Sequence, residues 1–136
     1  MKRFVWPVRV YYEDTDAGGV VYYANYLKFM ERARTEWLRA LGMEQDVLRQ
    51  QDGVLLMVHS LSVKYVKPAL FNAALQVTVG VEHVGKARMT FLQSVMSGDG
   101  SEYCRAEVTI ACVDEATGKP CAFPAQLQQV LKGEWV

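Results

Sequence analysis

The sequence lacks the features of a membrane-spanning or disulfide-stapled protein. No apolar run approaches the roughly 18 residues of a membrane helix, and Met1 to Arg9 contains no apolar stretch of signal-peptide length. The three cysteines, Cys104, Cys112 and Cys121, are odd in number and lack paired spacing, which argues against a disulfide framework. We therefore expect a soluble, reduced, cytoplasmic protein with no membrane span.

Excess charge is also absent, because 15 basic and 15 acidic residues give a formal net charge of zero. Nucleic-acid-binding domains carry a basic face, so no nucleic-acid partner is expected. The sequence contains no C-x-x-C spacing and no Cys/His cluster, so neither a metal site nor a cofactor is predicted. With 136 residues, 51% of them hydrophobic, the chain fits one domain, residues 1–136, with a substantial core.

Apolar periodicity predicts one long helix and several strands. Phe4 to Tyr12 is rich in Val and Tyr and predicts a strand. Asn25 to Leu41 carries apolar residues at helical spacing, with Asn25 as a candidate N-cap and Gly42 as the stop. Alternating apolar and polar residues predict strands around 60–65, 75–82, 87–92 and 105–112, and short helices are expected at 44–50 and 124–131.

This order of elements predicts a two-layer α+β domain, in which one long helix packs on a sheet. Short turns between successive strands favour antiparallel pairing. Because one helix cannot cover five strands, we expect the protein to form an oligomer.

The segment from Tyr12 to Tyr26 is the part of the chain richest in reactive groups. Asp14 and Asp16 follow a strand and precede both a Gly-Gly pair and the start of the long helix. A helix N-terminus exposes N–H groups that can hold an oxyanion. A carboxylate beside it can attack a carbonyl or activate water. These parts suffice for acyl transfer from a thioester, although such loops are more often simple caps and turns.

Several motifs together resemble a known family. They are Tyr12-x-Asp14-Thr15-Asp16, Gly19-Val20-Val21-Tyr22, Asn25-Tyr26, Glu31-Arg32-Ala33-Arg34, Val63-x-Tyr65 and Pro68-Ala69. This pattern resembles hotdog-fold acyl-CoA thioesterases of the 4-hydroxybenzoyl-CoA thioesterase type. It is most similar to the branch encoded with the Tol-Pal envelope system.

The resemblance implies a hotdog fold, with one long central helix wrapped by a five-stranded antiparallel sheet. It implies hydrolysis of an acyl-CoA to a free acid and coenzyme A, with Asp16 as nucleophile or general base. Backbone N–H groups near Tyr23 would position the thioester oxygen. The family forms homodimers, often paired into tetramers, with active sites between subunits. The branch also implies acyl carrier protein as a further partner, and it commonly has histidine where this chain has Tyr23.

Other charged residues are weaker candidates. Asp14 is expected to orient the loop by accepting backbone N–H bonds, and Glu31 is a second candidate acid that could pair with Arg34. His59 and His83 are expected to be structural or exposed. The candidate contacts to coenzyme A phosphates are Lys64, Lys67, Arg88 and Arg105.

Three other functions compete with the thioesterase. A magnesium-dependent phosphoryl-transfer enzyme would use the Asp14-x-Asp16 pair, but it needs further acidic loops that the chain lacks. A non-catalytic hotdog module would bind an acyl group or acyl carrier protein without turnover. A hotdog dehydratase is disfavoured because its Asp/His pair lies in a loop arrangement that is absent here.

Overall fold

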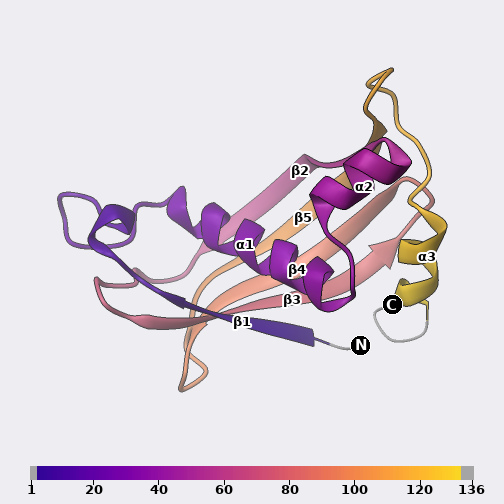
Figure 1. The fold of residues 1–136 in the computed structure, drawn as a ribbon. Coiled ribbons are helices and arrows are strands. Elements are labelled where there is room, and N and C mark those ends of the chain that lie inside the picture. The colour runs from indigo at the N-terminus through magenta and orange to yellow at the C-terminus, as the bar shows by residue number, and fades with distance from the viewer. Residues whose placement is uncertain (1–2, 133–136) are drawn as a thin grey trace.

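The computed structural model describes residues 3–132 (Figure 1). Its elements are β1 (Arg3–Arg9), a 3-10 helix η1 (Tyr12–Asp14), α1 (Asn25–Ala40), α2 (Gln45–Asp52), β2 (Val54–Tyr65), β3 (Ala74–Val84), β4 (Arg88–Ser97), β5 (Glu102–Asp114) and α3 (Ala125–Leu131). Within this part of the chain, no helix is both long enough and apolar enough to cross a bilayer.

All five strands join one antiparallel sheet in the order β1-β3-β4-β5-β2, so β1 and β2 form its edges. The helix α1 runs across one face of the sheet, while α3 lies at the end opposite the loop between β1 and α1 (Figure 1). The predicted α+β class and five-stranded antiparallel sheet are confirmed. The structure has three α-helices, α1 with 16 residues, α2 with 8 and α3 with 7, at the positions of the one long and two short helices that the sequence predicts.

The core lies between α1 and the sheet. Along β3, the apolar side chains that alternate with polar ones are fully buried, as at Val77 and Val79. On α1, Phe29 and Trp37 are 0% and 2% exposed, and the Trp37 ring meets Phe91 of β4 edge to face at 5.1 Å. Each fully buried side chain of this size contributes roughly 1.5–3 kcal/mol, so this contact surface fixes α1 on the sheet.

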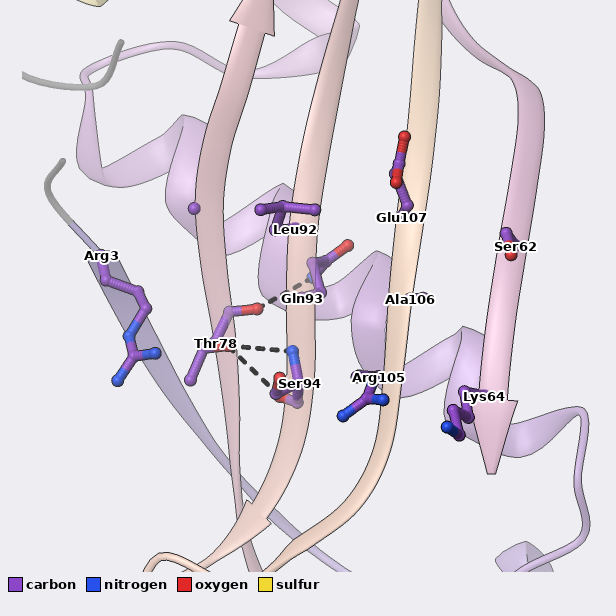
Figure 2. Close-up of a pocket in the computed structure, with 11 residues that line it drawn as sticks. Arg3, Ser62, Lys64, Thr78, Leu92, Gln93, Ser94, Arg105, Ala106 and Glu107 are labelled. Carbon is purple, nitrogen blue, oxygen red and sulfur yellow. Dashed lines mark hydrogen bonds between the residues drawn. The ribbon is translucent and has the colours of Figure 1, made fainter. Parts of the chain in front are cut away.

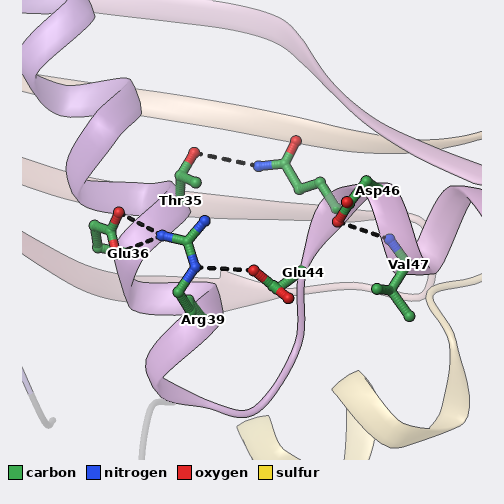
Figure 3. A network of polar contacts seen from close by, with 7 residues as sticks. Thr35, Glu36, Arg39, Glu44, Asp46 and Val47 are labelled. Carbon is green, nitrogen blue, oxygen red and sulfur yellow. Dashed lines mark hydrogen bonds and ion pairs between the residues drawn. The ribbon is translucent and has the colours of Figure 1, made fainter.

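Polar contacts join the end of α1 to the start of α2 (Figure 3). The Arg39 guanidinium donates to the carboxylates of Glu36 and Glu44, and its Nε lies 3.0 Å from Glu44. The chain reverses between the helices at Gly42, whose φ of 86° is one that side-chain-bearing residues rarely adopt. The predicted helix stop at this glycine is therefore confirmed.

The strand β2 is longer than its alternation predicts. Its pairing with β5 shifts register between Val58 and Ser60, which makes His59 an extra residue in a bulge. A bulge shifts the alternation of inward and outward side chains by one residue. The apolar run Leu55 to Val58 is therefore out of phase with the alternation from Ser60 onward. The exposed His59 agrees with the expectation that it is structural or exposed.

Candidate active site

A buried carboxylate fixes the loop between β1 and α1. Asp14 is only 4% exposed, and its Oδ2 accepts a hydrogen bond from the Tyr11 backbone N–H at 2.9 Å. Its Oδ1 accepts from the Asn25 side-chain amide, also at 2.9 Å, and its backbone carbonyl accepts from the Tyr22 N–H at 2.8 Å. Because a buried charge is costly without such partners, these contacts define the path of the loop. The orienting role predicted for Asp14 is confirmed.

The side chain of Asn25 does not cap α1, so that prediction is wrong. The N-cap position belongs to Ala24, which makes no side-chain capping bond, and Asn25 is the first helical residue. Asn25 is 6% exposed, and its amide is directed to Asp14 instead. The Asn25 side chain therefore bonds the buried Asp14 carboxylate, whereas the sequence pattern predicts that it caps the helix.

Asp16 lies in a tight turn two residues later and is exposed to solvent. Its Oδ1 accepts from the Gly18 N–H at 2.8 Å, while its own N–H donates to the Val20 carbonyl at 2.9 Å. A Cβ at Gly18 would lie 3.2 Å from that Oδ1, and Gly19 has a φ of 79°. The positive φ favours glycine at position 19, and a side chain at position 18 would make the Asp16 carboxylate shift by a few tenths of an ångström.

The N-terminal end of α1 follows this turn. Within residues 3–132, no acceptor is found for the backbone N–H of Tyr23. The carbonyl of Tyr23 accepts a hydrogen bond at 2.9 Å from the hydroxyl of Tyr65, the last residue of β2, and the two rings meet edge to face. Tyr23 precedes the N-cap residue Ala24, so its N–H lies just before the first turn of α1, next to the helix end that carries positive partial charge.

The segment after β2 packs against the same loop. The Val21 N–H donates to the Ala69 carbonyl at 2.9 Å, and the Ala69 N–H donates to the Tyr26 hydroxyl at 3.0 Å. The Tyr26 side chain is 3% exposed, and burial raises its pKa, so it stays a neutral hydroxyl. These contacts tie the 66–73 segment to α1 and close one side of the Asp16 loop.

The second candidate acid, Glu31, lies exposed on α1. Arg34 donates to the Gln93 side chain at 2.8 Å rather than bonding to Glu31, and burial lowers the Arg34 pKa. The Gln93 amide in turn donates to the Met30 carbonyl at 3.1 Å. Glu31 and Arg34 border a cavity of about 150 Å³ whose other walls include Trp37, Leu38, Leu56, Val58, Phe91 and Ile110.

The basic candidates divide between separate surfaces. Lys64 and Arg105 face each other across β2 and β5, and with Arg3 they line a hollow of about 500 Å³ on the sheet face away from α1 (Figure 2). Arg105 also pairs with Glu102 at 3.0 Å. Lys67 instead lies over the Tyr103 ring at 5.0 Å.

The remaining candidates do not join the loop. Arg88 is exposed at the start of β4, and His83 is exposed on β3.

In the part of the chain that the structure describes, no group of three or more His, Cys, Asp or Glu side chains could hold a metal ion.

Residues 10–131 match the thioesterase-like superfamily. The chain belongs to this superfamily. It is 44% identical over 125 residues to the acyl-CoA thioesterase YbgC of Haemophilus influenzae, covering 92% of this chain and 91% of the relative. It is 40% identical over 124 residues to the acyl-CoA thioester hydrolase YbgC of Escherichia coli, covering 91% and 92%. A probable thioesterase of Bartonella henselae superposes with a TM-score of 0.86 at 32% identity, covering 90% of this chain and all of that one.

The family resemblance carried by the loop motifs is therefore confirmed. Two long-range contacts of the structure are not predicted from the sequence. The Tyr65 hydroxyl reaches Tyr23 across 42 positions, and Gln93 reaches Met30 across 63. For the second contact, the sequence offers one local signal. Gln93 occupies an inward position of a strand, and a buried amide needs hydrogen-bond partners.

Proposed function

We propose that this chain is an acyl-CoA thioesterase that releases a free carboxylic acid and coenzyme A, with Asp16 acting on the thioester carbonyl. The observation that carries the proposal is the exposed Asp16 carboxylate, which a tight turn holds on the loop that leads into α1. Membership of the thioesterase-like superfamily and the names of the YbgC relatives support the same activity.

In this mechanism the Tyr23 N–H donates to the thioester oxygen and stabilises the negative charge that develops there. Asp16 either attacks the carbonyl carbon to form an anhydride, which water then cleaves at the Asp16 carboxyl carbon to release the free acid, or removes a proton from the water that attacks the thioester directly. In both routes the coenzyme A thiolate leaves as the carbon–sulfur bond breaks. From the end of β2, the Tyr65 hydroxyl bonds the carbonyl of Tyr23 and so restrains the backbone at this residue.

The site is proposed to lie between two subunits, with α1 as the central helix that each sheet wraps. The edge strand β2 supports this assembly, because Met57, Val58 and Leu61 on it are 44% to 51% exposed. An edge strand with exposed apolar side chains is a template for pairing with another strand. Pairing of two β2 strands would cover these residues and join the sheets edge to edge.

Release of free thiol from a panel of acyl-CoAs, from acetyl to palmitoyl and including benzoyl, tests the activity. We expect turnover on at least one member, and the profile will give the acyl group that the pocket accepts. Tight binding of an acyl-CoA without any turnover would overturn the proposal in favour of a non-catalytic acyl-binding module.

Turnover in ¹⁸O-labelled water separates the two routes. Attack by Asp16 places the label in its carboxylate after repeated turnover, whereas the general-base route places it only in the product acid. The label in Asp16 is read by mass spectrometry of the peptide that contains it.

A further inference from the structure

Two of the three cysteines lie side by side at the end of β5. The Sγ atoms of Cys112 and Cys121 are 3.6 Å apart. The backbone N–H of Cys121 donates to the Cys112 carbonyl at 2.9 Å, and the next pair, Val113 and Pro120, forms an antiparallel bridge. The two cysteines therefore occupy opposite positions on adjacent antiparallel segments.

This placement matches the geometry that a disulfide needs. Cys112 and Cys121 share one backbone hydrogen bond, and opposite residues in an antiparallel pair have Cα atoms about 4.5–5.5 Å apart. Disulfides span Cα separations of roughly 4.4–6.8 Å, so the backbone need not move to form one. The two sulfur atoms are already in contact at 3.6 Å.

We propose that Cys112 and Cys121 form a dithiol site that closes into an intramolecular disulfide on reaction with a low-molecular-weight disulfide. This site is independent of the proposed hydrolysis. Figure 1 shows α3, and the segment that leads into it from β5, at the end of the sheet opposite the loop that carries Asp16.

The two thiols have different exposures, and this sets the order of the reaction. Cys121 is half-buried and reaches solvent, whereas Cys112 is fully buried. Burial, together with the hydrogen bond to Cys121, raises the pKa of the Cys112 thiol to about 12, so Cys112 is a poor first nucleophile.

The exchange proceeds in two balanced steps. The Cys121 thiolate attacks one sulfur of the external disulfide, which forms a mixed disulfide and expels one thiolate. The Cys112 thiol then loses its proton to the expelled thiolate or to water and attacks the Cys121 sulfur, which expels the second thiol. The two cysteines lose two electrons, and the external disulfide is reduced to two thiols.

This disulfide would link the segment that leads into α3 covalently to the end of β5. That segment is already attached at Phe123, whose N–H donates to the Lys86 carbonyl at 2.9 Å, and at the buried Leu127. A covalent link restricts the unfolded chain and so stabilises the folded state. Oxidation is therefore expected to raise the Tm by several degrees while leaving thioester hydrolysis unchanged.

The test is titration of the whole protein with oxidised and reduced glutathione, followed by alkylation of free thiols in denaturant and mass spectrometry. We expect the oxidised wild type to retain one alkylatable thiol. Before alkylation, its mass should be lower than that of the reduced protein by two hydrogen atoms. Cys104→Ala is the matched control, because Cys104 is also buried on β5 but lies about 26 Å away along the strand. This variant should form the same disulfide.

Two further variants keep the result interpretable. Cys121→Ser should form no internal disulfide and should show no rise in Tm, while Cys112→Ala should stop at the mixed disulfide with glutathione. Retention of all three thiols by the wild type throughout the titration, or a disulfide that includes Cys104, would overturn the proposal. Turnover measured on the same samples reports on the proposed hydrolase activity separately.

Discussion

Asp14 and Asp16 are two positions apart and have opposite environments. Asp14 is buried, and both of its carboxylate oxygens accept hydrogen bonds, from the Tyr11 N–H and from the Asn25 amide. Asp16 is exposed and is held by one N–H, that of Gly18. Both oxygens of Asp14 are therefore used to hold the loop, whereas Asp16 has one oxygen that accepts no hydrogen bond from the described residues and can react with a substrate.

Gly18→Ala tests whether the orientation of Asp16 matters. The added Cβ would lie 3.2 Å from Oδ1 of Asp16 and displace the carboxylate. We expect kcat/KM for thiol release to fall about 10- to 100-fold, because small misplacements of a reacting group are costly. Gly98→Ala is the control, since a Cβ there meets no atom within 4 Å. Equal kinetics for the two variants would contradict the role given to the turn.

Asp14→Ala should act first on stability. It leaves the Asn25 amide and the Tyr11 N–H without their acceptor, so the free energy of unfolding should fall by about 2 kcal/mol. Urea denaturation measures this change. An unchanged midpoint would show that the buried carboxylate does not hold the loop.

At the scale of secondary-structure elements, α1 and the inner strands follow their periodicity closely. The sequence predicts α1 at Asn25 to Leu41, and the structure has it at Asn25–Ala40. The start of β2 was missed because the bulge at His59 breaks the alternation. Long-range contacts such as Tyr65 to Tyr23 could not be predicted, since they depend on how β2 and α1 are brought together.

Tyr65→Phe tests the link between β2 and the start of α1. The variant keeps the ring contact with Tyr23 and loses only the hydroxyl donor. We expect kcat to fall several-fold, with a change of no more than about 1 kcal/mol in the free energy of unfolding. Tyr12→Phe, at a ring that is 76% exposed, should change neither quantity. A Tyr65→Phe enzyme with wild-type kcat would remove Tyr65 from the site.

At the scale of the whole molecule, the two edges of the sheet are not equivalent. The edge strand β2 exposes several large apolar side chains, among them Met57 and Leu61, and its end carries Tyr65 of the candidate site. The edge strand β1 exposes one large apolar side chain among its described residues, Val5 at 46%. This asymmetry favours β2 as the strand that pairs with a second subunit.

A charge on the β2 edge should therefore break the assembly. Leu61→Lys would place an ammonium group in the proposed interface, where its desolvation is costly. We expect a smaller sedimentation coefficient and loss of turnover together. Val5→Lys adds the same charge to the other edge at similar exposure and should change neither property. A Leu61→Lys protein with unchanged size and activity would place the interface elsewhere.

The most direct test of the central claim compares Asp16→Asn with Asp99→Asn in the thiol-release assay. Both aspartates are exposed, and each accepts a hydrogen bond from the N–H two residues later, so the second substitution controls for the loss of charge in a turn. We predict that Asp16→Asn lowers kcat by at least about 1,000-fold while acyl-CoA binding persists, and that Asp99→Asn behaves as wild type. Wild-type turnover in Asp16→Asn would contradict the assignment of Asp16 as the reacting carboxylate.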